Sequence, residues 1–123
     1  MVVTPRSSRS LAGCPLLETN AAERVREAID AAGVPWSVVQ LGARTEYRFV
    51  APAPRTGSAS ADASDPMLED FLHVYMANRG ILITPFHNMA LMSPATTDAD
   101  VDRHSEVFEA ALATLVTSPT ERS

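Results

Sequence analysis

The feature that most constrains the fold is a short apolar run between two segments of helical periodicity. Residues 81–84 read Ile-Leu-Ile-Thr; they follow Gly80 and precede a turn at residues 85–88. A four-residue run bounded by turn residues is too short for a helix and is typical of a buried strand. A second apolar segment, residues 89–93, follows the turn. This stretch therefore predicts a strand, a turn and a strand between two helices.

The first helical segment covers about residues 15–32. Its apolar residues recur at three- and four-residue steps, which is the pattern of one apolar helix face. Pro15 suits the first turn of a helix, and Gly33 can take the left-handed conformation that ends one.

Two further helices flank the central stretch. Asp65 as a cap and Pro66 in the first turn open the second helix, which ends at Gly80. The third helix begins after Thr97, with acidic residues in its first turn, and frays near residues 117–119.

Two strands are expected between the first two helices. Residues 36–41 form a short segment with β-branched side chains at its centre, which is typical of a strand. Residues 44–50 alternate between charged and uncharged side chains, which is also typical of a strand. Gly42-Ala43 between them indicates a hairpin. Residues 51–64 show no period and are interpreted as a loop. The fold class is therefore α+β: a small, mostly antiparallel sheet of three or four strands with three helices on one face.

Length and charge limit the organisation and the partners. A chain of 123 residues fits one domain, which we place at residues 15–118, after a flexible leader (1–14) and before a short tail (119–123). The net charge of −5 without a basic cluster argues against nucleic acid as a partner. No apolar run reaches the roughly 20 residues that span a bilayer, so no membrane partner is expected. The single cysteine, Cys14, suits a reducing compartment, and we expect a cytoplasmic protein.

The sequence contains no lysine, and all ten of its basic residues are arginine. No side chain can therefore form a Schiff base with a carbonyl compound or with pyridoxal phosphate. We accordingly expect no cofactor bound covalently by this chain.

The turn at residues 85–88 holds one candidate binding site. His87 and Asn88 offer directional hydrogen bonds, and Phe86 offers an apolar wall. A ligand contact is one interpretation. The other is a plain turn in which Asn88 tolerates the backbone conformation and His87 faces solvent.

Arg44, Glu46 and Arg48 share one face of the second predicted strand. A guanidinium on such a face can bind a carboxylate through two parallel hydrogen bonds. The alternative is a solvated strand face with cross-strand ion pairs, which are common at protein surfaces.

No metal site is expected. His73 and His104 lie beside the apolar stripes of their helices, and neither has a second ligand one turn away. Asp98, Asp100 and Asp102 fall in the first turns of a helix, where capping explains them better than calcium binding does.

Four motifs together carry a family resemblance. They are EYRF (46–49), LHVYMANRGIL (72–82), TPFHNM (84–89) and SPATTDADVD (93–102). In this order they resemble the carboxy-terminal small domain of class III pyridoxal-phosphate-dependent aminotransferases, in the branch that contains glutamate-1-semialdehyde aminomutase. The resemblance covers roughly residues 15–116. Aminomutases carry an acidic residue after the proline of the turn, whereas this chain has His87-Asn88-Met89.

The resemblance implies the small-domain fold of fold-type I enzymes and a role in closing a substrate site over pyridoxal phosphate. The cofactor and its lysine would belong to a large domain supplied by another chain, and the enzymes are usually dimers. By position, Arg48, His87 and Asn88 would be contacts to an amino or keto acid substrate, and no residue matches a cofactor ligand of the family. The chain would not be catalytic alone. A non-catalytic protein-interaction module and a truncated, inactive product remain alternatives.

Overall fold

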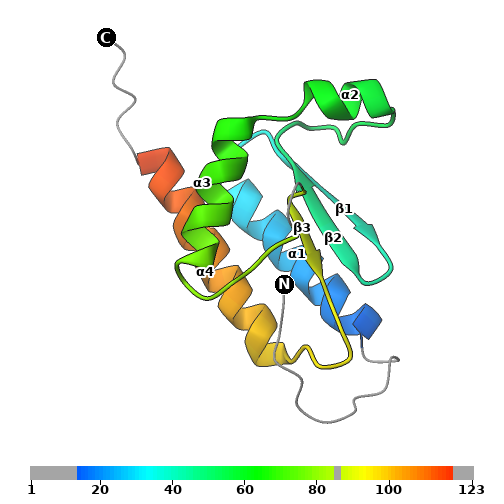
Figure 1. Cartoon of the computed structure of the whole chain (residues 1–123), viewed down its shortest axis with the longest axis vertical. Coiled ribbons are helices and arrows are strands. Elements are labelled where there is room, and N and C mark those ends of the chain that lie inside the picture. The colour runs from blue at the N-terminus through cyan, green and yellow to red at the C-terminus, as the bar shows by residue number, and fades with distance from the viewer. Residues whose placement is uncertain (1–13, 85–86, 118–123) are drawn as a thin grey trace.

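Three strands and four helices make up the described part of the chain. The computed structural model describes residues 14–84 and 87–117 (Figure 1). The elements in order are α1 (Cys14–Ala32), β1 (Ser37–Leu41), β2 (Arg44–Arg48), α2 (Gly57–Asp62), α3 (Pro66–Ala77), β3 (Met89–Leu91) and α4 (Asp98–Thr117). The expected leader up to residue 13, the turn residues 85 and 86, and the expected tail lie outside the described residues. None of the described helices is both long and apolar enough to cross a membrane.

The strands form one antiparallel sheet in the order β1-β2-β3. Gly42 turns the chain between β1 and β2 with a φ of 57°, a left-handed conformation that glycine adopts without a steric penalty from a Cβ. In the register of the sheet, Thr45 lies between Gln40 of β1 and Ala90 of β3. The predicted fold class, α+β with a small antiparallel sheet, is confirmed.

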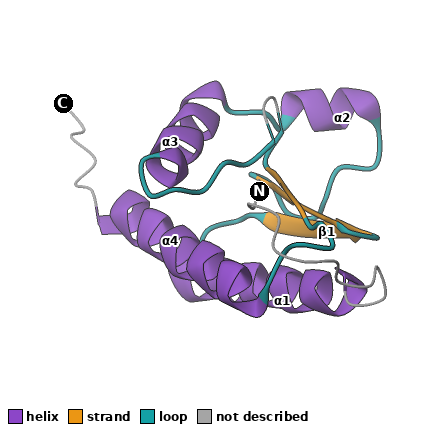
Figure 2. Ribbon diagram, turned by 60° about the horizontal axis from the view of Figure 1, so that its bottom comes forward, coloured by secondary structure: helices purple, strands orange, loops and turns teal. Residues whose placement is uncertain are grey.

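The two faces of the sheet differ sharply, as the alternation along β2 predicts. Thr45 and Tyr47 are buried, whereas Arg44, Glu46 and Arg48 point to the opposite side. Figure 2 shows α1 and α4 on one side of the sheet and α2 on the other. We call the side of Thr45 and Tyr47 the inner face and the side of the charged residues the outer face.

Tyr47 stands at the centre of the core on the inner face. Its ring centroid lies 5.0 Å from that of Phe108 in α4 and 6.5 Å from that of Trp36, which precedes β1. Its hydroxyl donates a weak hydrogen bond to the Sδ atom of Met76 in α3, at 4.0 Å. Burial raises the pKa of the Tyr47 hydroxyl well above its usual value, because the anion would lose its hydration. One side chain thus connects the sheet with α3 and α4.

The helix starts match the expected capping residues. The Asp65 carboxylate accepts hydrogen bonds from the first free backbone N–H groups of α3, at 3.1 and 3.2 Å. At α4 the Thr97 hydroxyl accepts from the Asp100 N–H at 3.3 Å, and the Asp100 carboxylate accepts from the Thr97 N–H at 2.8 Å. This reciprocal pair is a capping box, and it fixes where α4 begins.

The predicted strand at residues 81–84 is wrong. Ile81 and Ile83 are buried in the core, but the segment is an extended loop whose link to β3 is one hydrogen bond from the Thr84 N–H to the Met89 carbonyl, at 3.1 Å. The alternate burial of Ile81 and Ile83 imitates the burial pattern of a strand, although the segment lacks a ladder of hydrogen bonds to a neighbouring strand. The predicted loop at residues 51–64 is wrong in part, because it contains α2, which buries no residue and so lacks an apolar stripe.

His104 corrects a further expectation, because it is buried rather than beside the stripe of α4. It is 1% exposed, and its ring stacks on Phe108 with centroids 6.1 Å apart. Neither ring nitrogen has a hydrogen-bond partner among the described residues. Burial lowers the pKa of His104 to about 4, since the imidazolium would lose its hydration.

This burial predicts a loss of stability in acid. The unfolded chain binds a proton at His104 below a pH of about 6.5, while the folded chain resists it down to about 4, so stability falls across that window. The expected contribution is about 2–3 kcal/mol between pH 7.5 and pH 4.5. Urea unfolding at both pH values measures it. His104→Phe should remove this part of the pH dependence and His73→Gln should not. Equal pH dependence in the wild type and His104→Phe would contradict the assignment.

Candidate functional site

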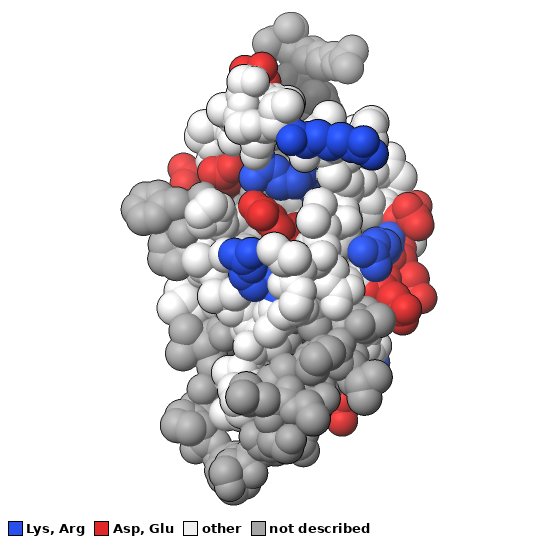
Figure 3. All heavy atoms as spheres, turned by 90° about the vertical axis from the view of Figure 1, so that its right-hand side faces the viewer, with Lys and Arg blue, Asp and Glu red and all other residues white. Residues whose placement is uncertain are grey.

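The outer face of the sheet gathers a connected set of charged side chains. Glu46 lies at its centre, because one carboxylate oxygen, Oε1, is 3.0 Å from Arg48 Nη1 and 3.7 Å from His87 Nδ1. Figure 3 views the molecule from the side of the β1–β2 hairpin and shows arginine and acidic side chains close together among uncharged atoms. Strand β2 supplies Glu46 and Arg48, and the turn before β3 supplies His87.

Arg48 is committed to contacts within the chain. Besides the bond to Glu46, its Nη2 donates to the Ser60 carbonyl at 2.5 Å and to the Ser60 hydroxyl. Ser60 belongs to α2, so this guanidinium fastens α2 onto the outer face of the sheet. Hydrogen bonds from a charged donor are among the stronger ones in proteins, especially when partly shielded from water. Arg48 therefore organises the site rather than standing free to meet a ligand.

His87 has an open side chain and a fixed backbone. Its side chain is 55% exposed, while its carbonyl accepts a hydrogen bond from His73 Nε2 in α3 at 3.0 Å. The His87 N–H donates to the Thr84 carbonyl at 3.3 Å. The imidazole can thus reach a molecule lying on the outer face while α3 holds its backbone.

Asn88 lies on the opposite side of the sheet from Arg48 and His87. Its carbonyl accepts a hydrogen bond from the Tyr47 N–H at 3.0 Å, which continues the β2–β3 pairing by one residue. Asn88 is 3% exposed, and its Oδ1 has no partner among the described residues. The structure therefore brings Arg48 and His87 together and places Asn88 in the core, where it shapes the turn.

Beside the charged set, the outer face has a small hollow of about 120 Å³. Val39, Leu41 and Met89 give it apolar walls, and Arg44 and Glu46 give it charge. The Arg44 guanidinium forms no hydrogen bond or ion pair with any other described residue. Alternation along β2 had identified Arg44 as a candidate binding residue. The apolar walls beside it were not predicted, because they come from β1 and β3 and depend on the register of the three strands. Alternation within β1, which puts Val39 and Leu41 on one side, was the available signal.

A metal centre finds no support in the part of the chain that the structure describes. No group of three His, Cys, Asp or Glu residues there could hold an ion. Asp100 caps α4, and Asp102 forms an ion pair with Arg24 of α1. The acidic start of α4 is thus used for capping and for helix pairing.

Solved structures resemble the chain closely over most of its length. A glutamate-1-semialdehyde aminomutase from Pseudomonas aeruginosa PAO1, in complex with PMP, matches 86% of this chain with 39% identity and a TM-score of 0.84. A β-phenylalanine aminotransferase from Variovorax paradoxus matches 82% with 22% identity and a TM-score of 0.74, which shows a shared fold. An omega-transaminase from Sphaerobacter thermophilus matches 84% at 22% identity, with a TM-score of 0.68.

These matches cover only part of the other proteins. The chain spans 23% of the aminomutase and of the β-phenylalanine aminotransferase, and 24% of the omega-transaminase. No protein-family model matches the sequence, and no curated protein does. The chain therefore has the fold of one segment of aminomutase and aminotransferase chains, about a quarter of their length.

The two hydrogen bonds from Arg48 to Ser60 predict that loss of this guanidinium frees α2. In Arg48→Gln, the backbone amides of residues 57–62 should exchange with deuterium about tenfold faster, because α2 buries no residue of its own. Hydrogen exchange read by mass spectrometry measures this rate. Arg44→Gln, the same change on the same face without a partner to lose, is the control. Equal exchange in both variants would show that Arg48 does not hold α2.

Proposed function

We propose that the chain acts as the carboxy-terminal small domain of a class III pyridoxal-phosphate-dependent aminotransferase or aminomutase. Its role would be to close a substrate site over a cofactor held by residues outside these 123, whether in the same polypeptide or in another chain. The observation that carries the proposal is the match to the aminomutase structure, with 39% identity and a TM-score of 0.84 over 86% of the chain. Such agreement over nearly every described element favours common descent over convergent packing.

In this proposal the cofactor is held by residues outside these 123. There is no lysine to carry pyridoxal phosphate as an imine, and the Arg48 guanidinium is held by hydrogen bonds to Glu46 and Ser60. When bound to a complete enzyme, the cofactor supplies the electron sink for amino-group transfer. We therefore assign this chain to the substrate side alone.

The outer face supplies what a substrate wall needs. Arg44, whose guanidinium has no partner among the described residues, would bind the carboxylate of an amino or keto acid beside the apolar walls of the hollow. His87 stands near, with an exposed imidazole that can donate or accept a hydrogen bond. Arg48 positions α2 and Glu46 beside them, and Asn88 holds the turn that bears His87.

A non-catalytic interaction module is the second candidate. Leu41 is 65% exposed and Val39 43% exposed, and both lie on the outer face. A surface with these side chains is suited to another protein. In the first proposal that protein is a large aminotransferase domain, with a homo-oligomer of the complete enzyme as a further partner. In the second it is unrelated to amino-group chemistry.

A chimeric enzyme tests the first proposal. Residues 14–117 of this chain replace the segment that they match in the Pseudomonas aeruginosa aminomutase. We expect the chimera to fold, to bind pyridoxal phosphate and to exchange amino groups with some amino acid. The isolated 123-residue chain, treated with pyridoxal phosphate and borohydride, should show no modified side chain on peptide mapping. A folded chimera that binds the cofactor but transfers no amino group from any amino acid would favour the interaction module.

The same chimera tests Arg44. Arg44→Gln should raise KM for the amino acid about ten- to a hundredfold, since it removes a charge-assisted contact to the carboxylate. Steady-state kinetics measure the effect, and Arg26→Gln on the exposed side of α1 is the control. An unchanged KM in Arg44→Gln would remove Arg44 from the substrate site.

A further inference from the structure

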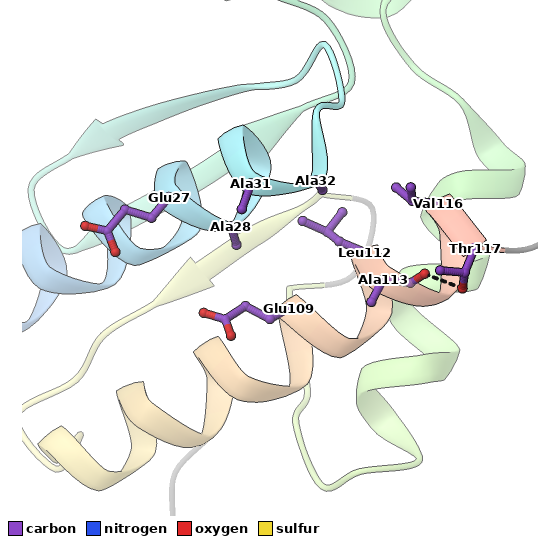
Figure 4. Close-up of a pocket in the computed structure, with 9 residues that line it drawn as sticks. All are labelled: Glu27, Ala28, Ala31, Ala32, Glu109, Leu112, Ala113, Val116 and Thr117. Atoms are coloured by element: carbon purple, nitrogen blue, oxygen red, sulfur yellow. Dashed lines mark hydrogen bonds between the residues drawn. The ribbon is translucent and has the colours of Figure 1, made fainter.

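A second concave surface lies between α1 and α4, and none of the residues that form the outer face lines it. It has a volume of about 540 Å³ and we call it the α1–α4 groove (Figure 4). Its lining residues are Glu27, Ala28, Ala31, Ala32, Glu109, Leu112, Ala113, Val116 and Thr117. Their positions place it along the carboxy-terminal halves of both helices.

The α1–α4 groove is lined mainly by apolar side chains. Leu112 is 1% exposed and forms part of the main core, while Val116 is 54% exposed. Four of the nine lining residues are alanines, which let another backbone approach closely. An exposed apolar groove between two helices favours the apolar face of another helix as its occupant.

Charge at both ends of the groove is negative. Glu27 and Glu109 extend toward the same end in Figure 4, and neither has a hydrogen-bond or ion-pair partner among the described residues. α1 and α4 run in the same direction, so both helices end at the other end of the groove, at Ala32 and Thr117. Neither helix has a basic residue in its last turn to offset the negative end of its dipole.

We propose that the α1–α4 groove binds a helix of another polypeptide that is apolar on one side and carries lysine or arginine along its flanks. From Glu109 to Thr117 the groove extends about 12 Å, at roughly 1.5 Å per residue, so it accommodates about two helical turns. The occupant would therefore insert apolar residues at positions i, i+3 or i+4, and i+7. A second copy of this chain, docked groove to groove, would instead bring negative charge against negative charge, whether its carboxylates meet the same carboxylates or the ends of the two helices.

A designed peptide tests the proposal on the full 123-residue chain. The probe is a fluorescein-labelled 18-residue peptide of leucine and lysine with its leucines at helical spacing. Fluorescence anisotropy should show saturable binding at one peptide per chain. A peptide with the same pattern and glutamate in place of lysine should bind at least tenfold more weakly.

Matched variants localise the binding. Glu27→Gln with Glu109→Gln should weaken the leucine–lysine peptide at least tenfold. Glu23→Gln with Glu106→Gln changes the same charge on the same helices outside the groove, and it should leave binding within twofold. Ala113→Trp, which fills the groove, should abolish binding while circular dichroism shows an intact fold.

Three outcomes would overturn the proposal. Equal weakening by both glutamate pairs would mean that the peptide follows the overall negative charge. Unchanged binding in a folded Ala113→Trp variant would place the peptide elsewhere. A concentration-dependent dimer in light scattering that Ala113→Trp abolishes would make a second copy of this chain the occupant.

Discussion

The burial of Tyr47 in the middle of β2 is the interaction on which the rest of the structure depends. Its ring packs on Phe108 and Trp36, its hydroxyl meets Met76, and its backbone N–H bonds to Asn88. Because successive strand residues point to opposite faces, a buried Tyr47 sends Glu46 and Arg48 outward. The charged set on the outer face is thus a direct consequence of the aromatic core behind it.

The sequence predicts those elements whose signals are local. Alternation along β2 predicted which side chains share a face of the sheet, and Asp65 and Thr97 predicted where α3 and α4 begin, because capping acts within one turn. The predicted strand at residues 81–84 was wrong because a strand needs a hydrogen-bonded neighbour, and hydrophobic periodicity does not show whether one is present. The burial of His104 was not predicted because the apolar face expected for α4 was too narrow. The buried face of the helix is wider and includes His104, which lies next to Val101 and Phe108 on the helix surface.

The candidate site was predictable in its residue types and not in their roles. Arg44 and Arg48 look alike in sequence, since both lie on the charged face of β2 and alternate with the uncharged Thr45 and Tyr47. Contacts that sequence periodicity could not reveal distinguish them: Glu46 and Ser60 engage Arg48, whereas the Arg44 guanidinium has no hydrogen-bond or ion-pair partner among the described residues. Likewise, Asn88 follows His87 directly, yet the β2–β3 register sends it to the inner face. Roles at this site therefore depend on contacts between segments far apart in the chain.

The two exposed surfaces differ in the partner chemistry they can satisfy. The hollow on the outer face combines apolar walls with Arg44 and Glu46, and the Arg44 guanidinium suits an anionic group held against an apolar surface. The α1–α4 groove combines apolar walls with two carboxylates and two helix ends, so it suits a cationic, apolar element. The two surfaces share no lining residue, so the two ligands proposed here, a carboxylate at Arg44 and a helix in the α1–α4 groove, would not compete for the same side chains.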